Sequence, residues 1–377
     1  MKYTIVGAGI GGLSTAVALE QKGIEYQLVE KVPEFKEVGA GILLAPNALQ
    51  VYEKLGLLDA VKSEGNFVDR ITIGKSDFSP LSDLFQNDIK KIYGYSTIAI
   101  HRARLQKLLV NRIPKDKLLL GKDFKSYSNR KDEKVCVKFE DNTELISDYL
   151  IGADGINSKI RKQLFPNAKI RYTGQTCWRG IANFDFDDDL KNRCVELWGE
   201  EIRFGFSKIS EGKVYWFAVA KRKSNQQDYI EEVKDKLSKM YANFDPIISQ
   251  LIASTPFNQI FRNDINDLEP MATWYDNKTC LIGDAGHATT PNMGQGGGQA
   301  IEDAYCLSNI LEKHSGNQAF GSFQQQRKQK VDNIVSQSWM TGKIAHWKYG
   351  TGVRNFLLKN MPKNMMLKKM IAMYRID

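Results

Sequence analysis

The sequence predicts an α/β protein in which a parallel sheet with flanking helices is combined with a separate layer of antiparallel strands. A short strand at 3–6, an apolar helix that ends near Gly23 and a second strand at 26–29 predict a βαβ start. Aromatic strands at 202–206 and 214–219 indicate the antiparallel layer. The class is therefore α/β, or α+β when this layer is counted, with further helices at the C-terminal end.

Composition places the 377 residues among ordinary globular proteins. Hydrophobic residues make up 42% and charged residues 26% of the chain, which excludes disorder, collagen and a disulfide-built mini-protein. The five cysteines are scattered without CxxC spacing, so we expect a reduced, cytoplasmic chain with no metal site. We also expect no signal peptide and no membrane span, because no apolar run approaches roughly 18–20 residues.

The residue pattern changes along the chain from a βαβ type to aromatic alternating strands, and this change predicts two domains. Residues 1–69, 101–170 and 276–377 are expected to form a discontinuous first domain that includes the C-terminal helices, and residues 70–100 and 171–275 a second one. Other expected elements are helices at 45–64, 101–112, 228–241 and 299–311, and a meander at 117–150.

The strongest motif is a Gly-x-Gly-x-x-Gly between the first strand and the first helix. Gly7 permits a tight turn, Gly9 lets a pyrophosphate approach the backbone, and Gly12 lets the helix pack close to the sheet. Glu30 ends the second strand, where a carboxylate can accept hydrogen bonds from ribose hydroxyls. Lys31, the next residue, is also predicted to bind the cofactor. Together they predict a bound dinucleotide, and the motif alone does not separate FAD from NAD.

Two acidic motifs follow predicted strands further along the chain. Asp154-Gly155 comes after a strand at 149–153, and Gly283-Asp284 after a strand at 279–282. A proline-containing loop and a glycine-rich helix start follow Asp284. The unblocked amides of this helix start can stabilise negative charge on a bound ring.

In this order the three motifs resemble those of the single-component FAD monooxygenases of the p-hydroxybenzoate and salicylate hydroxylase type. Segments at 38–49 (VGAGILLAPNAL), 178–180 (WRG) and 294–304 (GQGGGQAIEDA) are similar to the branch that contains salicylate and urate hydroxylases and zeaxanthin epoxidase. The resemblance covers nearly the whole chain. It implies a Rossmann-like FAD-binding domain and an antiparallel-sheet substrate domain.

The resemblance also implies how the cofactor is held. The three motif glycines would cradle the FAD pyrophosphate and Glu30 the adenosine ribose. Arg102, which opens an Arg-x-x-Leu, would contact FAD, and Asp154 would lie in the motif shared with the transient nicotinamide partner. Asp284 would bind the ribityl chain. The loop residues expected beside the flavin ring are Gly294, Gly296 and Gly297.

Two positions depart from the family pattern in this loop. Gly286 stands where a second alanine is common, and Gly298 where asparagine is frequent. These small changes weaken the inference about contacts to the flavin ring more than the inference that flavin binds.

The implied reaction is oxygenation of an aromatic or conjugated apolar small molecule. NADH or NADPH would reduce the flavin, the flavin would capture O2 as a C4a-hydroperoxide, and the distal oxygen would pass to the substrate by hydroxylation or epoxidation. An FAD-dependent reductase or dehydrogenase on the same scaffold, or a non-enzymatic flavin-binding protein, remain as alternatives. The WxWxIP segment expected of a flavin-dependent halogenase is absent from the sequence.

Two residues of the antiparallel layer are candidates for the catalytic site. Arg203 alternates onto the face opposite its aromatic neighbours, and Tyr215 stands on the adjacent predicted strand. The resemblance implies that both face the substrate; an arginine at a domain interface with a packing tyrosine fits equally well. His287 is favoured as a structural loop residue bonded to backbone rather than a base, and Glu302 and Asp303 as structural residues.

The positive charge of the chain is concentrated at its end. Residues 327–377 contain 11 Lys and Arg against 2 Asp and Glu, so they account for the whole net charge of +9. This pattern argues against a nucleic-acid-binding face and indicates one local basic element. Its apolar residues and lysines predict two short helices separated by Pro362. We favour packing against the FAD domain over peripheral contact with anionic lipid. Substrate identity, the choice of NADH or NADPH and the oligomeric state are not predicted.

Overall fold

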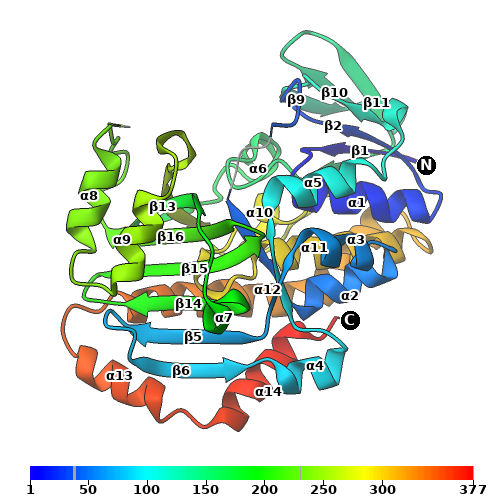
Figure 1. Cartoon of the computed structure of the whole chain (residues 1–377). Helices are drawn as coiled ribbons and strands as arrows, with labels where there is room; N and C mark the ends of the chain where they lie inside the picture. Colours follow the sequence, from blue (N-terminus) through cyan, green and yellow to red (C-terminus); the bar gives the residue numbers. More distant parts are fainter. Residues whose placement is uncertain (37–39, 230, 377) are drawn as a thin grey trace.

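A five-stranded parallel sheet forms one half of the molecule (Figure 1). The computed structural model describes residues 1–36, 40–229 and 231–376. Every neighbouring pair in this sheet is parallel, and α1 (Ile10–Gln21) leads from its central strand to the next. This arrangement confirms the predicted βαβ start. In spatial order the strands are β18 (Thr279–Leu281), β12 (Tyr149–Gly152), β1 (Lys2–Val6), β2 (Glu25–Val29) and β8 (Leu118–Leu119).

A seven-stranded sheet forms the other half. One face is covered by α8 (Val233–Met240) and α9 (Pro246–Ala253), and the aromatic residues Trp178, Phe204 and Trp216 are buried there. The sheet is antiparallel apart from the parallel pair β14–β5. Strands β5 and β6 come from an earlier part of the chain and extend the sheet at the β14 edge. The spatial order is β17 (Phe261–Leu268), β13 (Ile170–Asn183), β16 (Lys213–Lys221), β15 (Ile202–Ser210), β14 (Arg193–Trp198), β5 (Arg70–Lys75) and β6 (Pro80–Phe85).

Two smaller sheets complete the strand structure. The meander expected at 117–150 is confirmed by β9 (Phe124–Asn129), β10 (Val135–Phe139) and β11 (Glu144–Ser147). The second small sheet joins β3 (Gly41–Leu44), β7 (Thr97–His101) and β4 (Asn66–Val68). The predicted division into two domains stays a prediction.

Two helix predictions differ from the structure. The helical stretch expected at 45–64 is divided into α2 (Pro46–Lys54) and α3 (Leu58–Glu64), because Gly56 adopts a φ of +66° that ends the first helix. The helix expected at 228–241 begins only at the start of α8, and residue 230 lies outside the described residues. The start of the VGAGIL segment, residues 38 and 39, also lies outside them.

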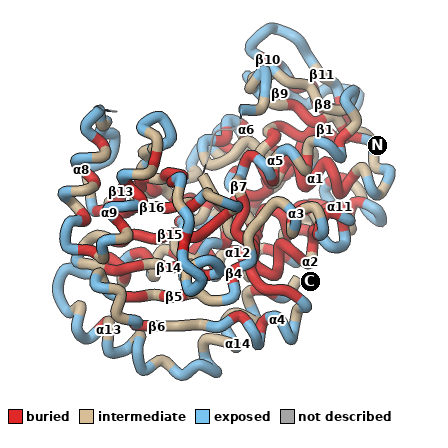
Figure 2. The backbone as a smooth tube through the Cα atoms, in the orientation of Figure 1, coloured by how far each residue is buried: buried red, intermediate tan, exposed pale blue. Residues whose placement is uncertain are grey.

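The C-terminal end forms a long helix and two short ones, and the break at Pro362 is confirmed. They are α12 (Gly316–Ala345), α13 (Thr351–Lys359) and α14 (Lys363–Tyr374). The apolar residues of α14 pack beside α4 (Asn87–Tyr93), where Tyr374 is buried. Figure 2 shows that α13 is largely exposed. Packing against the body of the protein is therefore confirmed for α14, while the outer apolar residues of α13 remain at the surface.

Candidate active site

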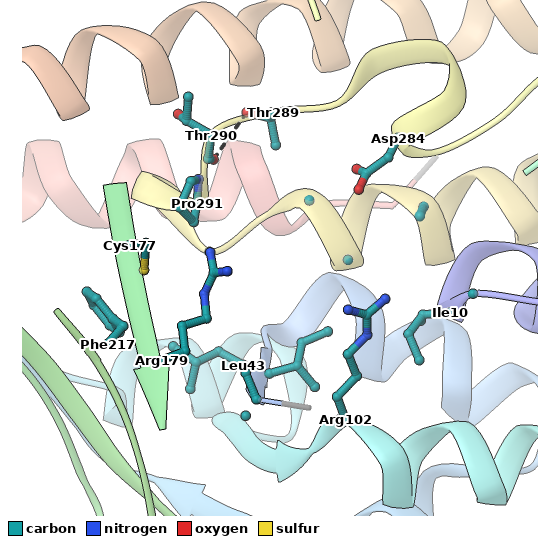
Figure 3. Close-up of a pocket in the computed structure, with 18 of the residues that line it drawn as sticks. Ile10, Leu43, Arg102, Cys177, Arg179, Phe217, Asp284, Thr289, Thr290 and Pro291 are labelled. Carbon is teal, nitrogen blue, oxygen red and sulfur yellow. Dashed lines mark hydrogen bonds between the residues drawn. The ribbon is translucent and has the colours of Figure 1, made fainter. Parts of the chain in front are cut away.

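A cavity of about 420 Å³ lies between the parallel sheet and the uncovered face of the seven-stranded sheet (Figure 3). We call it the main cavity. The turn after β1, strand β3, the loop after β18 and the first turn of α11 (Gly296–Leu311) supply one side of its lining. Strands β13, β14, β15 and β16 supply the other side. The topology thus brings predicted cofactor residues and the predicted catalytic residues to one cavity, although not every predicted site residue lines it.

The glycine motif forms a turn with open space above its centre. Gly7 has a φ of +104°, and a Cβ atom there would lie 2.4 Å from the carbonyl oxygen of Ala153. A Cβ atom on Gly9, in contrast, would meet nothing within 4 Å. This space lies at the N-terminus of α1, where backbone amides favour a phosphate group. The turn therefore fits the pyrophosphate of a dinucleotide.

Glu30 is held at the end of β2 beside this turn. Its Oε2 accepts a hydrogen bond from the backbone amide of Ala8 at 2.6 Å, and its Oε1 accepts one from Val32 at 3.2 Å. The carboxylate is thereby fixed at the position where the sequence predicts a ribose contact. Lys31 is exposed and does not line the main cavity.

Asp154 lies behind the cavity lining rather than in it. Its carboxylate accepts a hydrogen bond from Ser158 Oγ at 2.6 Å and one from the amide of Ile160 at 3.2 Å, which supports the start of α6 (Lys159–Leu164). Burial raises the pKa of Asp154 above its ordinary value, and the hydrogen bond from Ser158 acts in the opposite direction. The next residue, Gly155, lines the cavity.

Asp284 and Arg102 point toward the same part of the main cavity (Figure 3). Asp284 begins α10 (Asp284–His287) and is exposed to the cavity. The surrounding protein raises the pKa of its carboxyl, while His287 and Arg102 act to lower it. The loop glycines expected beside the flavin ring, which are Gly294, Gly296 and Gly297, also line the cavity.

A buried charge cluster holds these loops in place. Asp303 Oδ2 accepts a hydrogen bond from the amide of Gly283 at 2.9 Å and lies 2.6 Å from His287 Nε2. Arg327 Nε donates to Asp303 Oδ1 at 2.9 Å, and Arg327 also pairs with Glu302. These contacts agree with the structural interpretation of His287, Glu302 and Asp303, which stays a prediction. The bonding partner of the His287 side chain, however, is a carboxylate and not the backbone that we expected.

Arg203 and Tyr215 both line the main cavity, as their strand positions predicted. Arg203 is buried; its NH1 donates to Glu196 Oε1 at 2.9 Å and its NH2 to Asn292 Oδ1. The ring of Tyr215 lies against Gly41, where a Cβ atom would come within 2.5 Å of the ring. The geometry is compatible with substrate contact by either residue, which stays a prediction.

Sequence reasoning missed Arg179 and Phe217, which also line the main cavity. These residues are opposite each other in the β13–β16 register, and the ring of Phe217 lies over Gly205 of β15. Alternation within the WRG segment separates Arg179 from the buried Trp178, and this was the one signal that could have identified it. The strand register that places Arg179 at the cavity could not be predicted from the sequence.

A second, more polar cavity of about 680 Å³ adjoins the main one. We call it the side cavity. It is lined by carboxamide side chains, among them Asn157, Asn225 and Asn266. Arg179 lines both cavities, and Asp284, Thr289 and Pro291 are also shared.

Comparison with known proteins agrees with this geometry. The family model described as FAD binding domain matches residues 1–338, so the chain belongs to that family of flavin-binding proteins. Aurachin C monooxygenase/isomerase of Stigmatella aurantiaca is 34% identical over 95% of this chain and 93% of that protein. The 2-heptyl-3-hydroxy-4(1H)-quinolone synthase of Pseudomonas aeruginosa is 32% identical over 96% of this chain and 94% of that protein.

A solved structure of similar shape contains the expected cofactor. Klebsiella pneumoniae HpxO complexed with FAD and uric acid superimposes with a TM-score of 0.91 and 27% identity, over 99% of this chain and 96% of that one. The resemblance to FAD monooxygenases is therefore confirmed. The protein is an FAD-dependent monooxygenase.

Proposed function

We propose that the substrate is a nitrogen heterocycle that carries an oxo group on a ring carbon, and that NADH or NADPH supplies the electrons. The observation that carries this proposal is the lining that the seven-stranded sheet contributes to the main cavity. This lining combines the aromatic Phe217 with the polar groups of Arg179 and Tyr215. A flat ring can pack against the aromatic part while its oxygen meets hydrogen-bond donors.

The relatives support this substrate class. One relative is named for a 4(1H)-quinolone product, and the HpxO structure holds uric acid. Both compounds are nitrogen heterocycles that carry oxo groups on ring carbons. Bound FAD supplies the oxygen-transfer chemistry, and this chain holds the cofactor, excludes water with its apolar residues and orients the ring.

The test is a screen of oxo-substituted heterocycles against the purified holoenzyme. We expect 4(1H)-quinolones to accelerate NADH or NADPH consumption and to gain one oxygen atom, as measured by mass spectrometry. One polypeptide should suffice for both half-reactions. A requirement for a separate reductase would contradict the single-component assignment, and consumption without any oxygenated product would contradict the substrate class.

We further propose that α13 makes a peripheral contact with anionic lipid. Four large apolar residues are exposed on α13 and just before it, and Lys348, Lys359 and Lys363 nearby in the chain are also exposed. An apolar patch bordered by lysines matches the chemistry of an anionic lipid surface. Within the described part of the chain, no helix combines the length and apolarity needed to cross a bilayer. The apolar residues are Tyr349, Val353, Phe356 and Leu357.

A further inference from the structure

Two arginines of the seven-stranded sheet enter the main cavity, and their charges are balanced differently. Arg203 forms an ion pair with Glu196, whose Oε1 also accepts a hydrogen bond from Trp198 Nε1 at 2.9 Å. Arg203 also tethers Asn292, in the loop that precedes α11. Its charge is therefore compensated by the protein itself, and its bonds hold the loop to the sheet.

Arg179 has no such partner. Among the described residues, no carboxylate lies within ion-pair distance of its guanidinium. Its polar neighbour is the hydroxyl of Tyr215, which is within hydrogen-bonding reach. In Figure 3 the guanidinium points into the cavity toward Pro291, with Cys177 and Phe217 on the same sheet.

The pair carries a net positive charge at neutral pH. A guanidinium remains protonated in proteins. Burial raises the pKa of the Tyr215 phenol, so this group stays neutral and can donate a hydrogen bond. A cation beside apolar side chains is costly without a counter-charge, and the uncompensated charge of Arg179 faces the space that a ligand would fill.

We propose that Arg179, together with the Tyr215 hydroxyl, binds the oxo group of the substrate and favours the deprotonated, oxyanion form of the heterocycle. This inference rests on the proposed substrate class and names the group that recognises it. Binding transfers the N–H or O–H proton of the heterocycle to solvent, and the electron pair stays on the ring. The neighbouring ring carbon becomes more electron-rich, which suits attack on an electrophilic oxygen.

The structure separates this role from cofactor binding. The predicted cofactor residues Gly9 and Arg102 line the main cavity but not the side cavity and come from the other side of the lining, whereas Arg179 comes from β13 of the seven-stranded sheet. Its place at the junction with the side cavity also leaves room for substituents on the ring. Replacement of Arg179 should therefore change ligand recognition and leave FAD content unchanged.

The test compares two probes that differ by the oxygen, 4(1H)-quinolone and quinoline, on the FAD-loaded enzyme. Dissociation constants are measured by the change in flavin absorbance. We expect the wild type to bind the quinolone about 10- to 100-fold more tightly than quinoline, as for a hydrogen bond to a charged group. In Arg179→Met this ratio should fall to near one. The ultraviolet titration of the bound quinolone should show a lowered ring pKa in the wild type only.

Two further variants make the result decisive. Arg262→Gln is the matched control, because Arg262 lines the side cavity but not the main cavity and pairs with Asp228 and Asp264; its ratio should stay as in the wild type. Arg179→Lys keeps the charge but loses the planar pair of donors, so its ratio should be intermediate. If Arg179→Met fails to fold, Arg179→Lys carries the test.

Several results would overturn the inference. They are an unchanged ratio in the Arg179 variants, a wild-type ratio near one, or loss of FAD as the main effect of Arg179→Met. Failure of the proposed function gives a different result. In that case no oxo-substituted heterocycle is oxygenated, whatever the ratio of the two dissociation constants.

Discussion

A Cβ atom on Gly12 would lie 1.9 Å from the carbonyl oxygen of Gly7, because the first turn of α1 packs directly on the end of β1. Gly9, between them, has no neighbouring atom within 4 Å of such a position. The same motif therefore contains glycines that the packing of the fold requires and a glycine that the packing leaves free, which we expect to face the ligand.

This contrast predicts different outcomes for two substitutions. Gly9→Val should fold normally but lose FAD, because its side chain occupies the space for the pyrophosphate. Gly12→Ala should be destabilised, since its Cβ collides with backbone. The ratio of flavin to protein absorbance and thermal unfolding followed by circular dichroism would measure the two effects. A yellow Gly9→Val protein, or FMN instead of FAD in the wild type, would contradict the assignment.

The buried Asp303 should make stability depend on pH. Although burial acts to raise it, His287 and Arg327 hold the pKa of Asp303 at about 2, below about 3.9 for an unfolded aspartate. A lowered folded-state pKa stabilises the protein above about pH 4, and this contribution is lost as the pH falls toward 2. It amounts to about 3 kcal/mol in full.

Asp303→Asn should therefore show a shallower fall of unfolding free energy between pH 5 and 3 than the wild type. Urea unfolding followed by tryptophan fluorescence would measure this slope. At pH 7 the variant should be less stable by about 3 kcal/mol, because Arg327 keeps its charge in a buried site. Asp59→Asn, at an exposed carboxyl, should follow the wild type; the same behaviour in Asp303→Asn would refute the prediction.

Arg203→Ala and Tyr215→Phe should reduce substrate-dependent turnover while FAD content stays normal. Both residues line the cavity from the sheet, away from the dinucleotide motifs. Loss of the Arg203 bonds to Glu196 and Asn292 should lower kcat/KM about 10- to 100-fold. Arg130→Ala, on the exposed meander, is the control. Normal coupled turnover in both variants would contradict a role in substrate turnover and would indicate that the two residues only pack.

The exposed face of α13 should bind anionic vesicles in a salt-sensitive manner. Phe356→Asp with Leu357→Asp should reduce co-sedimentation, because the variant removes two exposed apolar residues and adds negative charge. Ile146→Asp, at an exposed apolar position of β11, is the matched control. These substitutions leave α14 in place, which a truncation after Tyr349 would not. Equal or absent binding by the three proteins would eliminate the membrane contact.

The cofactor side of the site could be predicted from the sequence because its signals are local. The glycine turn, Glu30 and the Gly283-Asp284 motif each follow a short buried strand, and the carboxyl ends of parallel strands meet at one edge of a sheet. The break at Pro362 was equally readable, since proline cannot continue a helix. The sequence by itself thus determined the fold class and indicated a dinucleotide together with the positions expected to hold it.

The tertiary structure decided which side chains are available to a ligand. Arg203 and Arg179 look alike in the sequence, but Glu196 compensates the first and no described carboxylate pairs with the second. That difference depends on strand register and on pairs of residues far apart in the chain, which local periodicity does not encode. The same holds for the tail, where α14 is covered by α4 and α13 is not. Motifs and helix breaks depend on residues that are neighbours in the sequence. The pairing of a buried charge and the burial of a helix face depend instead on which distant segments come into contact.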